Sequence, residues 1–118
     1  MGMFQTTGSN ERYGIIEGSR QRTIAAAGSS QTDATLIGAN VTIVSGASGT
    51  NGVILRKGKN LYSGVIYPSA ATNALLVYPP SGGTINGGSA NASFSVTARK
   101  PAIFYFITPI DIIINQSA

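Results

Sequence analysis

Cysteine and histidine are absent from this sequence. Without cysteine the chain has no disulfide, no thiolate nucleophile and no zinc knuckle. Without histidine, the catalytic triads that use an imidazole and most transition-metal sites are excluded. We therefore expect the stability of the fold to come from side-chain packing and from association between chains.

Charged residues are also scarce. They make up 10% of the 118 residues, whereas 42% are hydrophobic, and an ordinary soluble domain has about 25% charged residues. A surface with so little charge is poorly protected against association, so we expect other subunits to cover part of it. The net charge of +4 is too small to predict a nucleic-acid partner without a basic cluster.

The acidic residues do not form a recognisable catalytic pattern. The four carboxylates are Glu11, Glu17, Asp33 and Asp111, and the first two lie in a segment that does not resemble a core. A glycosidase needs a pair of carboxylates, and the sequence contains neither a P-loop nor a dinucleotide-binding fingerprint. We predict that the chain is not an enzyme and that it uses no cofactor and no metal ion.

No long apolar run is present. The uncharged stretch 60–98 contains three prolines and several glycines, and a membrane-spanning helix needs about 18 or more apolar residues in a row. We therefore expect no spanning helix and no membrane partner. The N-terminus also lacks the basic start and apolar core of a secretory signal.

Residues 1–21 differ in composition from the rest, because charged, small polar and isolated apolar residues alternate there. We interpret this segment as an extended N-terminal arm and residues 22–118 as the folded domain. An arm ordered by a partner is one interpretation and a disordered tail is the other. The residues expected to contact a partner are Phe4, Arg12, Tyr13, Ile15, Ile16, Arg20 and Arg22.

Short runs rich in β-branched and aromatic residues follow from Thr23 onward, and turn-forming segments separate them. The runs are 34–44, 51–57, 61–67, 74–78, 92–98, 102–108 and 111–115, after a first short run at 23–28. This spacing predicts an all-β fold, built as an antiparallel two-sheet sandwich. Jelly-roll wiring is one alternative, and strand order does not follow from the sequence.

The pattern within each run predicts which faces are buried. In 92–98, Phe94 and Val96 alternate with polar residues, which indicates one buried face. The runs 74–78 and 102–107 are continuously apolar, so we expect both of their faces to be covered, one by the second sheet and one by another subunit. The pairs Gly82-Gly83 and Gly87-Gly88 indicate two tight turns with positive φ.

Two sets of side chains leave alternatives open. The basic turn of Arg56, Lys57 and Lys59 is interpreted as a solvated hairpin tip, with contact to an acidic protein surface or to phosphate as alternatives. The four tyrosines in the runs are expected to pack in the core or between subunits, with a sugar-stacking platform as the alternative. They are Tyr62, Tyr67, Tyr78 and Tyr105.

The C-terminal part of the chain is rich in isoleucine and phenylalanine. So apolar a terminal strand must be buried. Either it closes a sheet within its own domain, or it packs at an interface between subunits. The residues of this oligomer-or-core set are Phe104, Phe106, Ile110, Ile112, Ile113 and Ile114.

Three segments together resemble a family. They are TIAAAGSSQTDATLI, VTIVSGASGTNGVIL and TNALLVYPPSGGTINGGSANASFSV. The last contains an N-A-L-x-V-Y-P strand followed by G-G-x-I-N-G and an alternating strand. Over residues 23–106 the chain resembles small all-β virion proteins of tailed bacteriophages, and it departs from them at the basic cluster in RKGKNLYSGVIY.

The resemblance implies a head decoration or cement protein. Such proteins bind the outer surface of the capsid as trimers and bridge capsid subunits with terminal arms. It implies that the partners are the major capsid protein and identical copies in a homotrimer, on the outer surface of the virion head. Related modules occur in head and tail fibres, so a receptor- or glycan-binding fibre module is the alternative.

Overall fold

The computed structural model describes residues 21–57 and 63–116, and every regular element within these ranges is a β-strand. The strands are β2 (Gln21–Ala25), β3 (Thr35–Ile37), β4 (Val41–Ser45), β5 (Gly52–Leu55), β6 (Ser63–Pro68), β7 (Leu75–Tyr78), β8 (Phe94–Val96), β9 (Ala102–Phe106) and β10 (Ile112–Gln116). The prediction of an all-β fold is confirmed. In this part of the chain no helix is available to cross a membrane.

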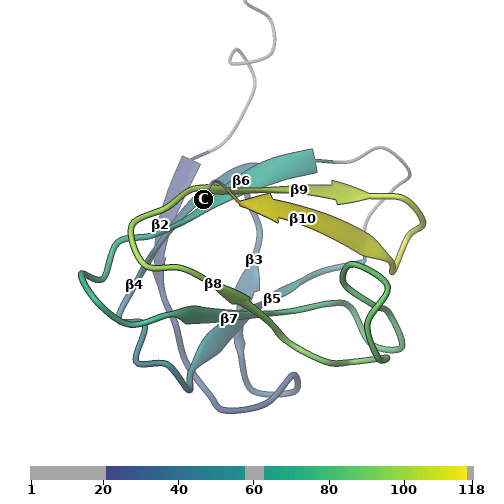
Figure 1. Cartoon of the computed structure of the whole chain (residues 1–118), viewed down its shortest axis with the longest axis horizontal. Helices are drawn as coiled ribbons and strands as arrows, with labels where there is room; N and C mark the ends of the chain where they lie inside the picture. The colour runs from purple at the N-terminus through teal and green to yellow at the C-terminus, as the bar shows by residue number, and fades with distance from the viewer. Residues whose placement is uncertain (1–20, 58–62, 117–118) are drawn as a thin grey trace, which may run out of the picture.

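The strands form two sheets that share one core (Figure 1). The five-stranded sheet has the order β10-β9-β6-β4-β2, and the four-stranded sheet has the order β3-β5-β7-β8. Consecutive strands from β2 to β7 lie alternately in the first and the second sheet. The chain therefore winds in successive coils, and each coil adds one strand to each sheet.

This winding makes neighbouring strands parallel. In the five-stranded sheet β2 pairs with β4 and β4 with β6, and in the other sheet β3 pairs with β5 and β5 with β7, all in parallel. The predicted antiparallel pairing is wrong for these strands. It is correct for β7 with β8, β6 with β9 and β9 with β10. The jelly-roll alternative is not confirmed, because that wiring is antiparallel.

Two local predictions fail for the same reason. The run 34–44 is not one strand, because the chain passes from β3 in one sheet to β4 in the other within it. The basic segment after β5 is not a hairpin tip, because β5 and β6 belong to different sheets. A run of β-forming residues shows that strands are present, but it does not show where the chain changes sheet.

Serine hydroxyls connect successive coils at one corner. Ala25 and Ser45 are the last residues of β2 and β4 and are in register, and Ser69 directly follows β6. The Ser45 hydroxyl donates to the carbonyl of Ile24 at 3.3 Å, and the Ser69 hydroxyl donates to the carbonyl of Val44 at 3.2 Å. Each hydroxyl therefore bonds the backbone one coil earlier, which helps to hold the stack in register.

The core lies between the two sheets. It contains Ile37, Val44, Ala47, Val53, Leu55, Ile66, Leu75, Val77, Ile85, Val96, Ala102, Phe104, Phe106, Ile112 and Ile114. Phe104 and Phe106 are fully buried and meet edge to face, with ring centroids 6.1 Å apart. Val96 is buried and Phe94 is half-buried, so the predicted inward face of 92–98 is confirmed.

Candidate functional site

Strand β9 separates the apolar residues of the C-terminal region into two sets. Phe104 and Phe106 are at most 1% exposed, whereas Ile103 and Tyr105 are each 43% exposed. Successive side chains of a strand point to opposite sides of the sheet, so Ile103 and Tyr105 lie on the side away from the core. Within the described chain the core covers one face of this strand, and the expected cover of the other face by another subunit stays a prediction.

The same alternation continues across the sheet and defines an outer face. Ile113 of β10 is opposite Tyr105, and Val65 of β6 is opposite Ile103. Val41 and Ile43 of β4 are in register with Val65 and Tyr67. We use "outer face" for these outward side chains together with Ile107, which follows β9 and is 56% exposed.

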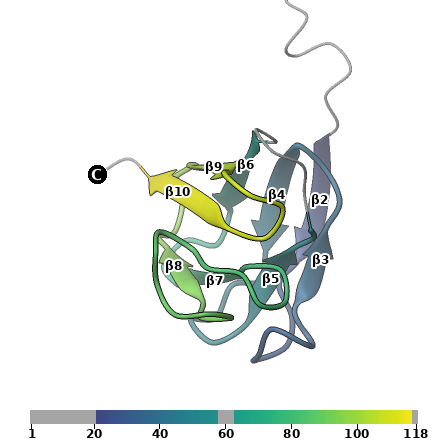
Figure 2. The same ribbon diagram turned by 90° about the vertical axis from the view of Figure 1, so that its right-hand side faces the viewer.

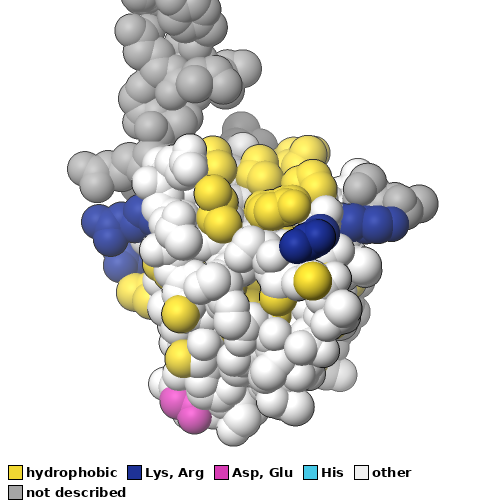
Figure 3. All heavy atoms as spheres, turned by 90° about the vertical axis from the view of Figure 1, so that its left-hand side faces the viewer, with side chains coloured by type: hydrophobic (Ala, Val, Ile, Leu, Met, Phe, Trp, Pro, Cys, Tyr) yellow, Lys and Arg dark blue, Asp and Glu magenta, His cyan; other side chains and the backbone are white. Residues whose placement is uncertain are grey.

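The outer face contains no charged side chain at any outward position of the described strands. Arg22 is the single charged residue in the five strands, and it is in register with the buried Thr42, on the inner side. The polar groups at the margin are hydroxyls and amides, such as Ser63 and Asn115. Figure 3 shows hydrophobic side chains gathered in the upper part of the view, with Lys and Arg side chains beside them.

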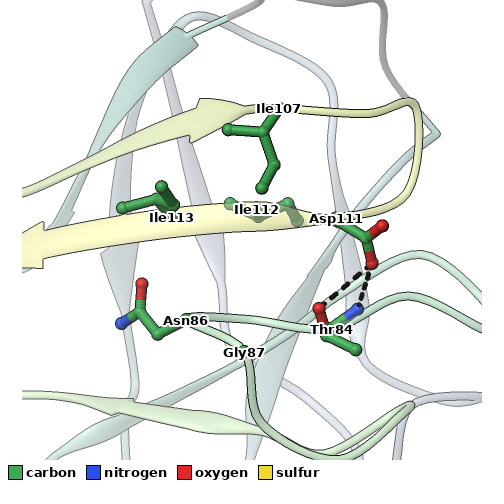
Figure 4. A pocket seen from close by; sticks show the side chains of 7 residues that line it. All are labelled: Thr84, Asn86, Gly87, Ile107, Asp111, Ile112 and Ile113. Carbon is green, nitrogen blue, oxygen red and sulfur yellow. Dashed lines mark hydrogen bonds between the residues drawn. The ribbon is translucent and has the colours of Figure 1, made fainter.

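A hollow of about 600 Å³ adjoins the outer face at one end. Thr84, Asn86 and Gly87 line one side of it, and Ile107 and Ile113 line the other (Figure 4). A second hollow of about 350 Å³ is lined by Val65, Pro101, Ile103, Asn115 and Gln116. The outer face therefore has one hollow beside Ile107 and Ile113 and another beside Val65 and Ile103.

The G-G-T-I-N-G segment, residues 82–87, lies against β10 (Figure 2). The Asn86 side chain accepts a hydrogen bond from the backbone N–H of Ile114 at 2.9 Å and donates one to the carbonyl of Ile114 at 3.1 Å. The backbones of Thr84 and Asn86 bond the N–H and the carbonyl of Ile112. The segment therefore occupies the backbone groups along this edge of the sheet, which would otherwise be open to pairing with another chain.

Glycine is required within this segment for two different reasons. Gly82 and Gly87 have φ values of 82° and 73°, so the predicted positive φ is correct for the first glycine of each pair. Gly83 has an ordinary φ but lies so close to the β9–β10 turn that a Cβ would overlap the carbonyl oxygen of Ile110. Asn86 also has a positive φ, 53°, which asparagine tolerates better than most residues.

Asp111 joins the segment to the turn before β10. One of its carboxylate oxygens accepts from the N–H and the hydroxyl of Thr84, at 3.1 and 3.0 Å, and the other accepts from the hydroxyl of Thr108 at 2.9 Å. Hydrogen bonds from Thr108 and then from Thr84 lower the pKa of the carboxyl below its usual value of 3.8. Asp111 thus acts as an acceptor that holds two loops together.

Asp33 has a similar role in another turn. Its Oδ1 accepts from the N–H groups of Ser29 and Ser30 and from the Ser30 hydroxyl. These bonds, with Ser30 the main donor, lower the pKa of the Asp33 carboxyl. Both described carboxylates are therefore engaged in turns. Among the described residues no three metal-binding side chains come together.

The predicted contact residues are placed as follows. Phe4, Arg12, Tyr13, Ile15, Ile16, Arg20, Lys59 and Tyr62 lie outside the described residues. Arg22 belongs to β2 and not to the predicted arm, and Arg56 and Lys57 are exposed after β5. Tyr67 and Tyr105 share the outer face, whereas Tyr78 is buried and its hydroxyl bonds the carbonyl of Ser29.

The oligomer-or-core set divides between the two alternatives. Phe104, Phe106, Ile112 and Ile114 belong to the core of their own chain. Ile110 is half-buried, and Ile113 is 42% exposed on the outer face. The sequence analysis did not predict that Ile103 and Ile107 would be exposed. Both are an even number of residues from Ile113, and the two-residue period of a strand could have indicated a common face.

Comparisons with models of protein families, with curated proteins and with solved structures found no match for this chain.

Proposed function

We propose that this protein is a non-enzymatic decoration or cement protein of a bacteriophage head, which attaches to the outer surface of the capsid and stabilises it. The outer face carries this proposal. Exposed apolar patches with polar margins are typical of protein–protein contact sites. The carboxylates of Asp33 and Asp111 accept hydrogen bonds that hold turns together, which also favours a binding function over acid–base chemistry.

We propose the phage head as the partner because of the family resemblance. One of its motifs, G-G-x-I-N-G, corresponds to the segment that closes the β10 edge. A motif with a structural role of this kind is expected to accompany a fold rather than one particular ligand. The attachment mechanism that we propose is multivalent, because several modest contacts linked in one assembly raise the effective concentration for each further contact.

Binding to heads tests the proposal directly. Purified protein is mixed with phage heads that lack it, and the bound copies are counted by quantitative mass spectrometry after the heads are washed. Hundreds of copies per head are expected for a decoration protein. Absence of binding contradicts the proposal. A variant lacking residues 2–20 tests the predicted arm, and full occupancy by this variant would remove the arm from the mechanism.

A fibre module that binds a receptor or glycan is the alternative, and one observation favours it. Tyr105 and Tyr67 lie on the outer face, and Tyr105 is 43% exposed, so aromatic surface is available for stacking on a sugar ring. A copy number of tens or fewer per particle, together with binding to a glycan array that Tyr105→Ala abolishes, would favour this alternative.

A further inference from the structure

We propose that a hollow on the four-stranded sheet, on the side away from the core, binds an extended acidic peptide segment of a partner protein. Aliphatic side chains form the centre of this hollow, and two cations stand at its rim. The surface belongs to a different sheet from the outer face, and its test uses no phage heads. The proposal and the proposed function can therefore fail independently of each other.

The hollow has a volume of about 310 Å³. Leu36 of β3 and Ile54 of β5 are in register, and they alternate along their strands with the core residues Ile37 and Leu55. The side chains of Leu36 and Ile54 therefore point away from the core. We use "β3–β5 hollow" for the depression lined by Leu36, Ile54, Leu55, Arg56, Lys57, Pro80, Ser81 and Ile110. Ligand pockets usually measure about 300–1,000 Å³, so this one suits a few side chains of a partner.

The centre of the β3–β5 hollow is aliphatic. Leu36 is 47% exposed, and Ile54 and Ile110 beside it are half-buried. The lining has no aromatic ring, and Ser81 is its one neutral polar side chain. Sugars and nucleotides are usually held by stacking on aromatic rings and by several hydrogen bonds. The lining therefore favours an aliphatic side chain of a partner as the group that enters the hollow.

Two cations give the rim its charge. Arg56 and Lys57 line the hollow, and both are exposed. The two described carboxylates are held elsewhere, because Asp33 accepts hydrogen bonds within its own turn and Asp111 lines the hollow beside Ile113. The rim is therefore complementary to carboxylates of a partner. Guanidinium and ammonium groups form strong, charge-assisted hydrogen bonds with carboxylates.

The backbone beside the hollow favours a peptide over a small anion. β3 is an edge of the four-stranded sheet in the described chain, and its pairing with β5 uses one side of the strand. The backbone groups on the other side of β3 are available to pair with an extended segment. At β10, by contrast, Asn86 already bonds the N–H and the carbonyl of Ile114. A peptide paired with β3 passes beside Leu36 and thus beside the hollow.

The positions of the aliphatic and charged groups predict a sequence pattern for the partner segment. Arg56 lies two residues beyond Ile54, and both line the same hollow. In an extended peptide, side chains two residues apart share one face and are about 6.6 Å apart. An aliphatic residue with an acidic residue two positions away can therefore place one side chain in the hollow and the carboxylate at the rim.

The test uses three short peptides with a fluorescent label and blocked ends. The first is Glu-Thr-Leu-Thr-Glu, which presents a carboxylate two residues from leucine in either strand direction. The second, Gln-Thr-Leu-Thr-Gln, removes the charge, and the third, Glu-Thr-Ser-Thr-Glu, removes the aliphatic side chain. Fluorescence anisotropy measures the binding of each peptide to the full-length protein. The three peptides are compared on the unmodified protein, so this comparison does not depend on the folding of any variant.

Matched variants locate the site. The double variant Arg56→Gln with Lys57→Gln removes the rim charges. The double variant Arg99→Gln with Lys100→Gln removes the same two charges in the turn after β8, outside the hollow. Leu36→Thr removes the exposed aliphatic side chain from the centre of the hollow. Circular dichroism verifies the fold of each variant.

We expect Glu-Thr-Leu-Thr-Glu to bind the unmodified protein at least about tenfold more tightly than either of the other two peptides, a difference of about 1.4 kcal/mol. The double variant at 56 and 57 and Leu36→Thr should each weaken its binding about tenfold or more. The double variant at 99 and 100 should bind it as the unmodified protein does.

Several results would overturn the proposal. They are a lack of binding of Glu-Thr-Leu-Thr-Glu at about 1 mM protein, equal binding of the glutamine peptide, and equal losses in the two double variants. If a heparin fragment binds through Arg56 and Lys57 and the peptide does not, the surface is a glycan site and the proposal is wrong. It is also wrong if the peptide binds only after removal of residues 2–20, because the chain's own N-terminal segment is then the occupant.

Discussion

The two sides of the β9–β10 hairpin have nearly the same composition and different surroundings. On the inner side Phe104, Phe106 and Ile112 are at most 1% exposed, whereas on the outer side Ile103, Tyr105 and Ile113 are 42–43% exposed. The inner residues contribute to the stability of the folded chain, because folding removes them from water. Folding removes much less of the outer side chains from water, so they remain available for a contact with another molecule.

The largest effect that tests this comparison is expected at Phe104. Phe104→Ala removes a fully buried ring that packs edge to face on Phe106, and it should lower the free energy of unfolding by about 3–5 kcal/mol. Tyr105→Ala on the outer side should change it by about 0.5 kcal/mol or less in the separated chain. Urea unfolding of dilute protein measures both values. Equal losses would show that the two sides do not differ in the way described.

The hydrogen bonds that close the β10 edge should contribute less to the free energy of unfolding than the packing of the core does. Asn86→Ala removes both hydrogen bonds to Ile114, and the expected loss is about 1–3 kcal/mol. Asn86→Asp keeps the acceptor for the Ile114 N–H but turns a carboxylate oxygen toward the Ile114 carbonyl, so it should also destabilise the protein. Hydrogen exchange observed by NMR should show faster exchange of the Ile114 amide in the alanine variant. An unchanged exchange rate would mean that Asn86 does not protect this edge.

Replacing Thr42, on the inner side of the same sheet, should have a smaller effect and should raise the stability of the protein. Thr42 is 1% exposed, and its hydroxyl has no hydrogen-bond partner among the described residues. Thr42→Val replaces the hydroxyl with a methyl group of similar shape and removes the cost of burying an unpaired polar group. The protein should gain about 1 kcal/mol, visible as a higher melting temperature. Thr23→Val, at an exposed outward position of β2, is the control and should have little effect.

The weakest expected effect is the dependence of stability on pH through Asp111. Folding lowers the pKa of this carboxyl below 3.8 because Thr108 and Thr84 donate to the ionised form. Its stabilising contribution is therefore complete above the unfolded pKa and is lost as the pH falls through the folded pKa. The melting temperature should fall on acidification below about pH 4. The fall should be smaller in Asp111→Asn, and a fall of equal size would exclude Asp111 as a cause.

Among Phe104, Asn86 and Asp111, the order of the expected effects follows from how completely each group leaves water. Phe104 is fully enclosed, Asn86 bonds a strand edge that is partly enclosed, and Asp111 keeps contact with solvent, which weakens its hydrogen bonds and screens its charge. A substitution at position 105 or 113, where the side chains are exposed, should therefore leave the fold of the single chain largely intact.

The sequence by itself determined that the fold is all-β, where most strands lie, and that Gly82 and Gly87 mark turns with positive φ. These features depend on local causes, namely the shape of β-branched side chains and the steric freedom of glycine. The alternation of Phe94 and Val96 with serine was enough to identify the inner face of β8, because side-chain direction in a strand has a period of two.

Only the tertiary structure decided which strands pair and in which direction. Parallel and antiparallel strands have the same local alternation, and the partner of β4 lies about 20 residues away in either direction along the chain. The same is true of the outer face. Ile103, Tyr105 and Ile113 resemble their buried neighbours in hydrophobicity, and what separates them is that the four-stranded sheet packs on the opposite side of their strands.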